Sequence, residues 1–155
     1  LWHMIGHVQT NKIKYMAPFV HMVHGVDREK VLRELDKQAK KVDRTINCLL
    51  QVHIAQEETK FGWSIVELEE VLPSLSAYTN IKVCGLMGMA SNTDNQDQIS
   101  KEFSGLSDFY NAQAQKQDWN TLSIGMSGDY TIALEYGATH VRIGSAIFGA
   151  RTYTP

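Results

Sequence analysis

Glycine and serine occur together in two short segments near the end of the 155-residue chain. The segments are Gly125–Asp129 (GMSGD) and Gly144–Ala146 (GSA), and each follows a short apolar run. Glycine lets backbone N–H groups approach an anion, a serine hydroxyl adds a hydrogen bond, and a following helix adds its dipole. Glycine and serine also occur in tight turns for geometry alone. Because the two segments follow the last two apolar runs of the chain, one after the other, the sequence favours a phosphate-binding site.

Arg142 is separated from the second segment by a single residue, Ile143, and lies within an apolar run. A buried charge without a partner is costly, so this guanidinium is expected to meet a ligand or to pair with a carboxylate inside the fold. A structural ion pair or an outward-facing side chain is the alternative. Arg142 is therefore the second candidate for a binding residue.

Other chemistry is less well supported. The six histidines lack Cys/His or HExxH spacing, so no metal site is expected. His21 and His24 are predicted to lie on opposite faces of a strand, and His140 is predicted to be isolated from the other histidines. Cys48 and Cys84 lie in apolar runs and are expected to be reduced core residues. No P-loop and no GxSxG motif occurs.

Six short apolar runs alternate with longer amphipathic stretches, which predicts parallel strands joined by right-handed crossovers. A doubly wound sheet and a (β/α)8 barrel both fit. A barrel has eight units in about 250 residues, so six units in a chain that opens inside a strand-like run favour a barrel lacking about its first two units. The predicted strands are Trp2–Ile5, Phe19–Val23, Ile46–Ile54, Lys82–Met87, Thr121–Ile124 and His140–Ile143.

Helix ends can also be predicted. Asp27 is expected to cap the first long helix, and Asp36–Lys40 is expected to form an i,i+4 pair on that helix. Ser64–Glu67 fits a capping box, and Gly137 fits the position that follows a helix C-terminus. In either architecture ligands bind at the carboxyl ends of the strands, where both glycine–serine segments fall.

Composition excludes several classes of protein. There are 15 basic and 17 acidic residues, a net charge of 15 − 17 = −2, which argues against a binder of nucleic acid or of anionic membranes. No apolar run approaches the roughly 20 residues of a membrane span, and no secretory signal is visible. We therefore expect residues 1–155 to form a single domain, or most of one, in a cytoplasmic protein.

Four stretches together resemble the pyridoxal phosphate homeostasis proteins: Trp2–Lys12, Ile46–Gly62, Val83–Ala90 and Leu122–Arg151. The resemblance covers essentially the whole chain. It implies a (β/α)8 barrel similar to the N-terminal domain of alanine racemase and bound pyridoxal 5′-phosphate (PLP) without established turnover. It further implies a role in buffering or delivering PLP, with PLP-dependent apoenzymes as candidate partners.

The resemblance also implies a set of cofactor-binding residues. The glycines and serines would bind the phosphate, and the arginine would lie near the pyridine nitrogen. An arginine there keeps that nitrogen unprotonated and weakens the ring as an electron sink, which suits a holder better than a catalyst. The implied residues are Ser127, Gly128, Arg142, Ile143, Gly144 and Ser145.

One departure from the family concerns lysine. The Schiff-base lysine of the family lies on its first strand, and no matching motif occurs here. Lys12, Lys14 and Lys60 are predicted in loops on the ligand side, and Lys82 at the opposite end of a strand, so none is an evident substitute. Two alternatives remain open: a racemase-like PLP enzyme, which would need two opposed bases not identifiable here, and an inert fragment of a PLP-binding parent.

Overall fold

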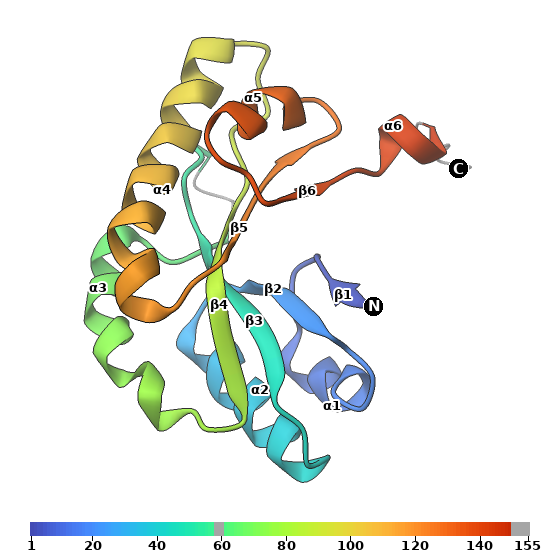
Figure 1. The fold of residues 1–155 in the computed structure, drawn as a ribbon. Coiled ribbons are helices and arrows are strands. Elements are labelled where there is room, and N and C mark those ends of the chain that lie inside the picture. Colours follow the sequence, from blue (N-terminus) through green and yellow to red (C-terminus); the bar gives the residue numbers. More distant parts are fainter. Residues whose placement is uncertain (58–60, 150–155) are drawn as a thin grey trace.

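The computed structural model describes residues 1–57 and 61–149 of the chain. Six strands form one sheet in which every neighbouring pair is parallel and the spatial order equals the chain order (Figure 1). A doubly wound sheet reverses its strand order at a switch point, whereas a barrel keeps consecutive strands adjacent. The sheet is therefore part of a barrel, as predicted. The strands are β1 (His3–Met4), β2 (Met22–Val26), β3 (Ile46–Val52), β4 (Ile81–Gly88), β5 (Thr121–Met126) and β6 (His140–Arg142).

Helices connect the strands and cover one face of the curved sheet (Figure 1). Within the described residues, no helix is long and apolar enough to cross a membrane. The helical segments are η1 (Thr10–Lys12), α1 (Ile13–Met16), α2 (Glu29–Lys41), α3 (Ile65–Val71), η2 (Leu72–Ala77), α4 (Gln96–Gln117), α5 (Tyr130–Glu135) and α6 (Ser145–Phe148).

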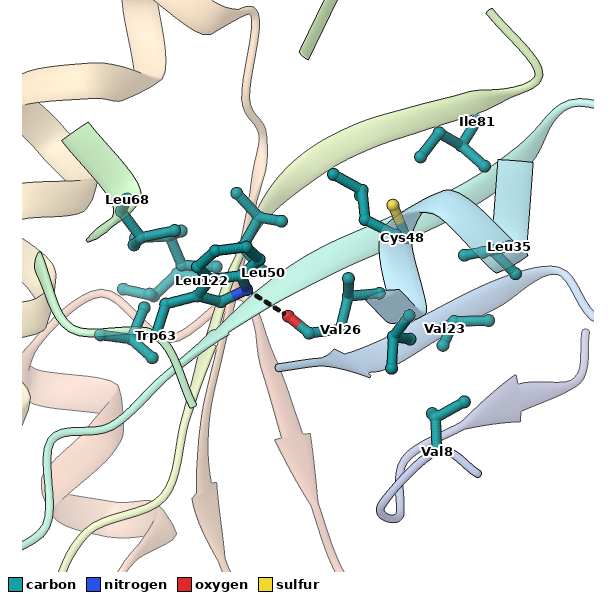
Figure 2. Close-up of a cluster of buried hydrophobic side chains, with 14 of the residues drawn as sticks. Val8, Val23, Val26, Leu35, Cys48, Leu50, Trp63, Leu68, Ile81 and Leu122 are labelled. Carbon is teal, nitrogen blue, oxygen red and sulfur yellow. Dashed lines mark hydrogen bonds between the residues drawn. The ribbon is translucent and has the colours of Figure 1, made fainter. Parts of the chain in front are cut away.

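The main hydrophobic core lies between the sheet and these helices. Figure 2 shows part of it, where Leu50 of β3 and Leu68 of α3 pack in one cluster. The indole N–H of Trp63 donates a 2.9 Å hydrogen bond to the carbonyl oxygen of Val26, so its polar atom is satisfied inside the core. Because side chains alternate along a strand, the next residues point to the opposite face, which we call the inner face.

The inner face carries a second, smaller apolar cluster. Its members are Met22, Leu49, Cys84 and Met87, from β2, β3 and β4. Cys84 and the fully buried Cys48 are free thiols, as predicted. The inner face also carries the polar residues described below.

Two predicted helix ends are confirmed. The Ser64 hydroxyl accepts a hydrogen bond from the Glu67 backbone N–H, and the Glu67 carboxylate accepts one from the Ser64 backbone N–H. Gly137 has a φ of 78°, and its N–H donates to the Leu134 carbonyl oxygen while the next N–H donates to that of Ala133. These two hydrogen bonds at the end of the helix need a residue in the left-handed backbone conformation at position 137, which explains the glycine there.

Three local predictions are wrong. The second strand is Met22–Val26 rather than Phe19–Val23, because a turn after α1 extends to Phe19 and leaves that ring exposed. Asp27 does not cap α2: its carboxylate is buried and bonds to the Arg28 guanidinium at 2.5 Å. The carboxylate of Asp36 accepts from Asn80, before β4, instead of pairing along its helix.

The capping box gives a stability prediction. Replacing Ser64 with alanine removes the acceptor for the Glu67 N–H and should lower the free energy of unfolding by about 1 kcal/mol. Urea unfolding of the wild type and of Ser64→Ala measures the difference. The control is Ser76→Ala, an exposed serine of the neighbouring η2 segment. An equal effect of both substitutions would contradict the capping role.

Candidate anion-binding site

The two glycine–serine segments meet at the carboxyl ends of β5 and β6. The Ser127 hydroxyl oxygen accepts hydrogen bonds from the backbone N–H groups of Gly144, at 3.1 Å, and Ala146, at 3.3 Å. Because β5 and β6 are adjacent and parallel, the turns that follow them are neighbours. Ser145 lies between the two donor residues, so the structure brings Ser127, Gly144 and Ser145 together, as the sequence predicts.

The first turn is held tightly against α5. The carboxylate of the buried Asp129 accepts from the Met126 N–H at 2.5 Å, and the Asp129 N–H donates to the Met126 carbonyl oxygen. Gly125 has a φ of 91°, and a Cβ there would lie 2.7 Å from the Cβ of Ala133. Glycine is therefore required for this close approach. Gly128, by contrast, faces open space at the tip of the turn.

The helices after the two turns are short. α5 has 6 residues and α6 has 4. A macrodipole builds up over several aligned turns, so neither helix supplies much of one. What the two turns offer instead is individual backbone N–H groups, two of which converge on the Ser127 hydroxyl oxygen.

Arg142 lies on the inner face and reaches across two neighbouring strands. Its Nη1 donates to the carbonyl and hydroxyl oxygens of Ser123, both at 2.9 Å, and its Nη2 donates to the carbonyl oxygen of Gly88 at 2.9 Å. Within the described residues these hydrogen bonds go to uncharged oxygens, so neither a structural ion pair nor an outward orientation is found. Burial lowers the pKa of Arg142 to about 10, which leaves it charged at neutral pH.

Next to Arg142 the structure places a cluster of histidines that the sequence analysis missed. The ring nitrogens of His24 lie 3.0 Å from the Ser123 hydroxyl and 3.0 Å from Nδ1 of His3. The rings of His21 and His140 stack on that of His3, with centroids 5.5 and 6.2 Å away. The predictions that His21 and His24 diverge and that His140 stands alone are therefore wrong.

The cause is the curvature of the sheet, which brings its two edge strands, β1 and β6, near one another although they do not pair. His3, His24 and His140 lie on β1, β2 and β6, and the curvature of the sheet brings these strands together. Because side chains alternate along a strand, the sequence could have predicted that Met22 and His24 lie on the same face of β2. Nothing in the spacing of the residues indicates that β1 and β6 approach the same point.

Three of the four lysines considered in the sequence have other partners in the described residues. Lys12 and Lys14 are in η1 and α1 rather than in loops, with their ammonium groups over the ring of Tyr15. Lys82 lies near the start of β4 and pairs with Asp118 at 3.4 Å, as expected for the opposite end of the strand. Lys60 is outside the described residues.

Burial of His24 predicts a pH dependence of stability. Desolvation, together with the charges of His3, Arg142 and His140, lowers the pKa of His24 to about 3 from its ordinary value of 6.5. The unfolded chain thus takes up this proton first, so stability present above pH 6.5 is lost as the pH falls toward 3. The largest slope one such group adds is about 1.4 kcal/mol per pH unit.

Urea unfolding between pH 7 and 4 tests this point. His24→Asn should flatten the acid slope, because the amide can keep the contact with Ser123 but does not titrate. The matched control is His53→Asn, which replaces a histidine outside the cluster, and the flattening should be specific to His24→Asn. Identical slopes for the wild type and His24→Asn would show that His24 is not held neutral.

Comparison with known proteins places the chain in a family. Residues 2–152 match the model of the alanine racemase N-terminal domain. The pyridoxal phosphate homeostasis protein of Vibrio alginolyticus is 38% identical over 99% of this chain and 66% of its own length. That of Aquifex aeolicus is 36% identical over 98% of this chain and 68% of its own. The chain belongs to the pyridoxal phosphate homeostasis protein family. It spans about two thirds of the length of these relatives.

Solved structures agree with this assignment. PipY of Synechococcus elongatus, solved without PLP, superposes with a TM-score of 0.89 at 30% identity, covering 96% of this chain and 70% of PipY. PipY with PLP bound superposes with a TM-score of 0.86 at 29% identity over the same shares. Alanine racemase of Clostridium difficile has a TM-score of 0.69 at 11% identity, covering 96% of this chain and 39% of its own, which shows a shared fold only.

Proposed function

We propose that this chain binds PLP between the two turns and Arg142, without turning it over, and so serves to keep PLP in balance. The observation that carries the proposal is the convergence of two backbone N–H groups on the Ser127 hydroxyl oxygen. The names of the relatives and the PLP-bound PipY structure support the choice of ligand.

The phosphate is proposed to bind where the Ser127 hydroxyl oxygen now accepts the two backbone hydrogen bonds. A phosphate oxygen would take the hydrogen bonds of Gly144 and Ala146, and the serine would turn its own O–H toward the phosphate. Hydrogen bonds to an anion are roughly twice as strong as those between neutral groups, so this exchange is favourable. Gly128 and Ser145 are exposed beside it, where a backbone N–H and a hydroxyl can add donors.

The ring is proposed to lie toward Arg142. The hydrogen bonds of Arg142 to Ser123 and Gly88 use its two terminal nitrogens, and no described residue accepts from its Nε–H, which we assign to the pyridine nitrogen. Ile143 joins Arg142 to the phosphate turn, so one small molecule can reach both ends of the site. PLP, when bound, supplies a reactive aldehyde and an electron-withdrawing ring. A guanidinium beside the ring nitrogen keeps that nitrogen unprotonated and limits this electron withdrawal.

We further propose a binding role rather than an enzymatic one. Lys12, Lys14 and Lys82 contact Tyr15 or Asp118, away from the site, so none is placed to act as a base there. Within residues 1–57 and 61–149, no specific contact supports the racemase-like alternative. Within the proposal, residues 1–155 act as a single domain in the cytoplasm, and PLP-dependent apoenzymes are the proteins that would receive the cofactor.

Ser127→Ala tests the phosphate end. The substitution removes one donor to the phosphate and should weaken PLP binding by about 0.5–1.5 kcal/mol. Calorimetric titration with PLP and with pyridoxal, which lacks the phosphate, measures the effect. Wild type should prefer PLP, and Ser127→Ala should reduce that preference, whereas Ser76→Ala should not. Equal affinity of the wild type for PLP and pyridoxal would contradict the phosphate assignment.

Reduction with borohydride tests the non-covalent mode of binding. If hydrogen bonds and charge alone hold PLP, treatment of the complex followed by peptide mapping should yield no stoichiometric lysine adduct. Inorganic phosphate should displace the ligand. A stoichiometric adduct at Lys12, Lys14 or Lys60 would show a covalent site on this chain and would reopen the enzymatic alternative.

A further inference from the structure

Ser123 joins two groups that approach it from opposite sides of the inner face. Its hydroxyl oxygen lies 2.9 Å from Nη1 of Arg142 on β6 and 3.0 Å from Nδ1 of His24 on β2. Ser123 is fully buried and His24 is 2% exposed. Hydrogen bonds between such buried groups are shielded from competition by water, so their directions are fixed by the chemistry of the partners.

The direction of each hydrogen bond can be worked out. A guanidinium only donates, so the Ser123 oxygen accepts from Arg142 and its single O–H remains for His24. His24 then accepts at Nδ1, carries its proton on Nε2, and donates to Nδ1 of His3, 3.0 Å away. The opposite tautomer of His24 would make Ser123 accept twice and turn its buried O–H away from this partner, which is costly.

This order leaves His24 uncharged beside the Arg142 guanidinium. Burial disfavours a second proton on His24 and lowers its pKa, as do the neighbouring His3, Arg142 and His140. Asp129 acts on Arg142 in the opposite sense and favours the charged guanidinium. The Arg142 guanidinium is thus a cation whose hydrogen-bonded neighbour Ser123 connects it to a neutral His24.

We propose that Ser123 and His24 are positioning residues for Arg142. They hold the guanidinium in one orientation on the inner face, with its Nε–H left for an aromatic ring nitrogen. The selection of the ring is thereby separated from the selection of the phosphate, which Ser127 and the turn of Gly144 perform. This inference rests on the proposed PLP site and adds the means by which its ring end is built.

Ser123→Ala is the test of this role, with Ser123→Thr as the variant that keeps the hydroxyl. The matched control is Ser107→Ala, which removes another buried serine hydroxyl, bonded to the Tyr136 carbonyl oxygen on the helix side. For each protein, affinities are measured for PLP and for inorganic phosphate. The nitrogen chemical shift of ring-labelled PLP is followed against pH.

Ser123→Ala should weaken PLP binding by about fivefold and leave phosphate binding within about twofold. It should also shift the pH at which the bound ring nitrogen is protonated, and Ser123→Thr should restore both properties. Ser107→Ala should change neither. A parallel loss of PLP and phosphate affinity, or equal behaviour of the two alanine variants, would mean a purely structural role and overturn the inference.

A second measurement needs no ligand. Nitrogen–proton NMR of the histidine side chains should show His24 neutral, with its proton on Nε2, and this tautomer should be lost in Ser123→Ala. A wild-type His24 with its proton on Nδ1 would overturn the inference. If the wild type binds neither PLP nor phosphate, the proposed function fails and the inference fails with it. If the wild type binds PLP and Ser123→Ala binds it equally, only the inference fails.

Discussion

The register between β5 and β6 determines the geometry of the site. Ser123 lies opposite His140 and Met126 opposite Arg142, so β5 uses one residue more than β6 over this stretch. An extra residue of this kind bends a strand and re-aims its side chains. Gly125, with its φ of 91°, lies inside that stretch. The irregularity places the Ser127 hydroxyl against the N–H groups after β6 and still leaves Ser123 beneath Arg142.

The inner face carries both apolar and polar side chains. Met22, Leu49, Cys84 and Met87 pack in one cluster, while Arg142 is held by three hydrogen bonds. A guanidinium buried without such bonds would destabilise the fold. The carbonyl oxygens of β4 and β5 supply two of them at no cost to the sheet, because a carbonyl has two lone pairs. The protein therefore keeps a cation in its interior at the ring end of the proposed site.

Much of this arrangement could be predicted from local sequence. The six apolar runs indicate the parallel units, Ser64–Glu67 indicates a helix start, and the two glycine–serine segments indicate two turns that meet at one end of the sheet. What failed depends on contacts between distant segments. Asp27 has the residue type of a helix cap, but its carboxylate pairs with Arg28 and His7 instead of with the backbone of the helix. The histidine cluster requires knowledge of the sheet curvature, which no spacing encodes.

The central claim is that one small molecule spans the Ser127 turn and Arg142. A crystal structure of the chain with PLP tests it most directly. We predict phosphate oxygens within hydrogen-bond distance of the Ser127 hydroxyl and the Gly144 and Ala146 N–H groups, with the ring nitrogen facing Arg142. A phosphate bound elsewhere, for example against Lys12, or a ring nitrogen turned away from Arg142, would contradict the account.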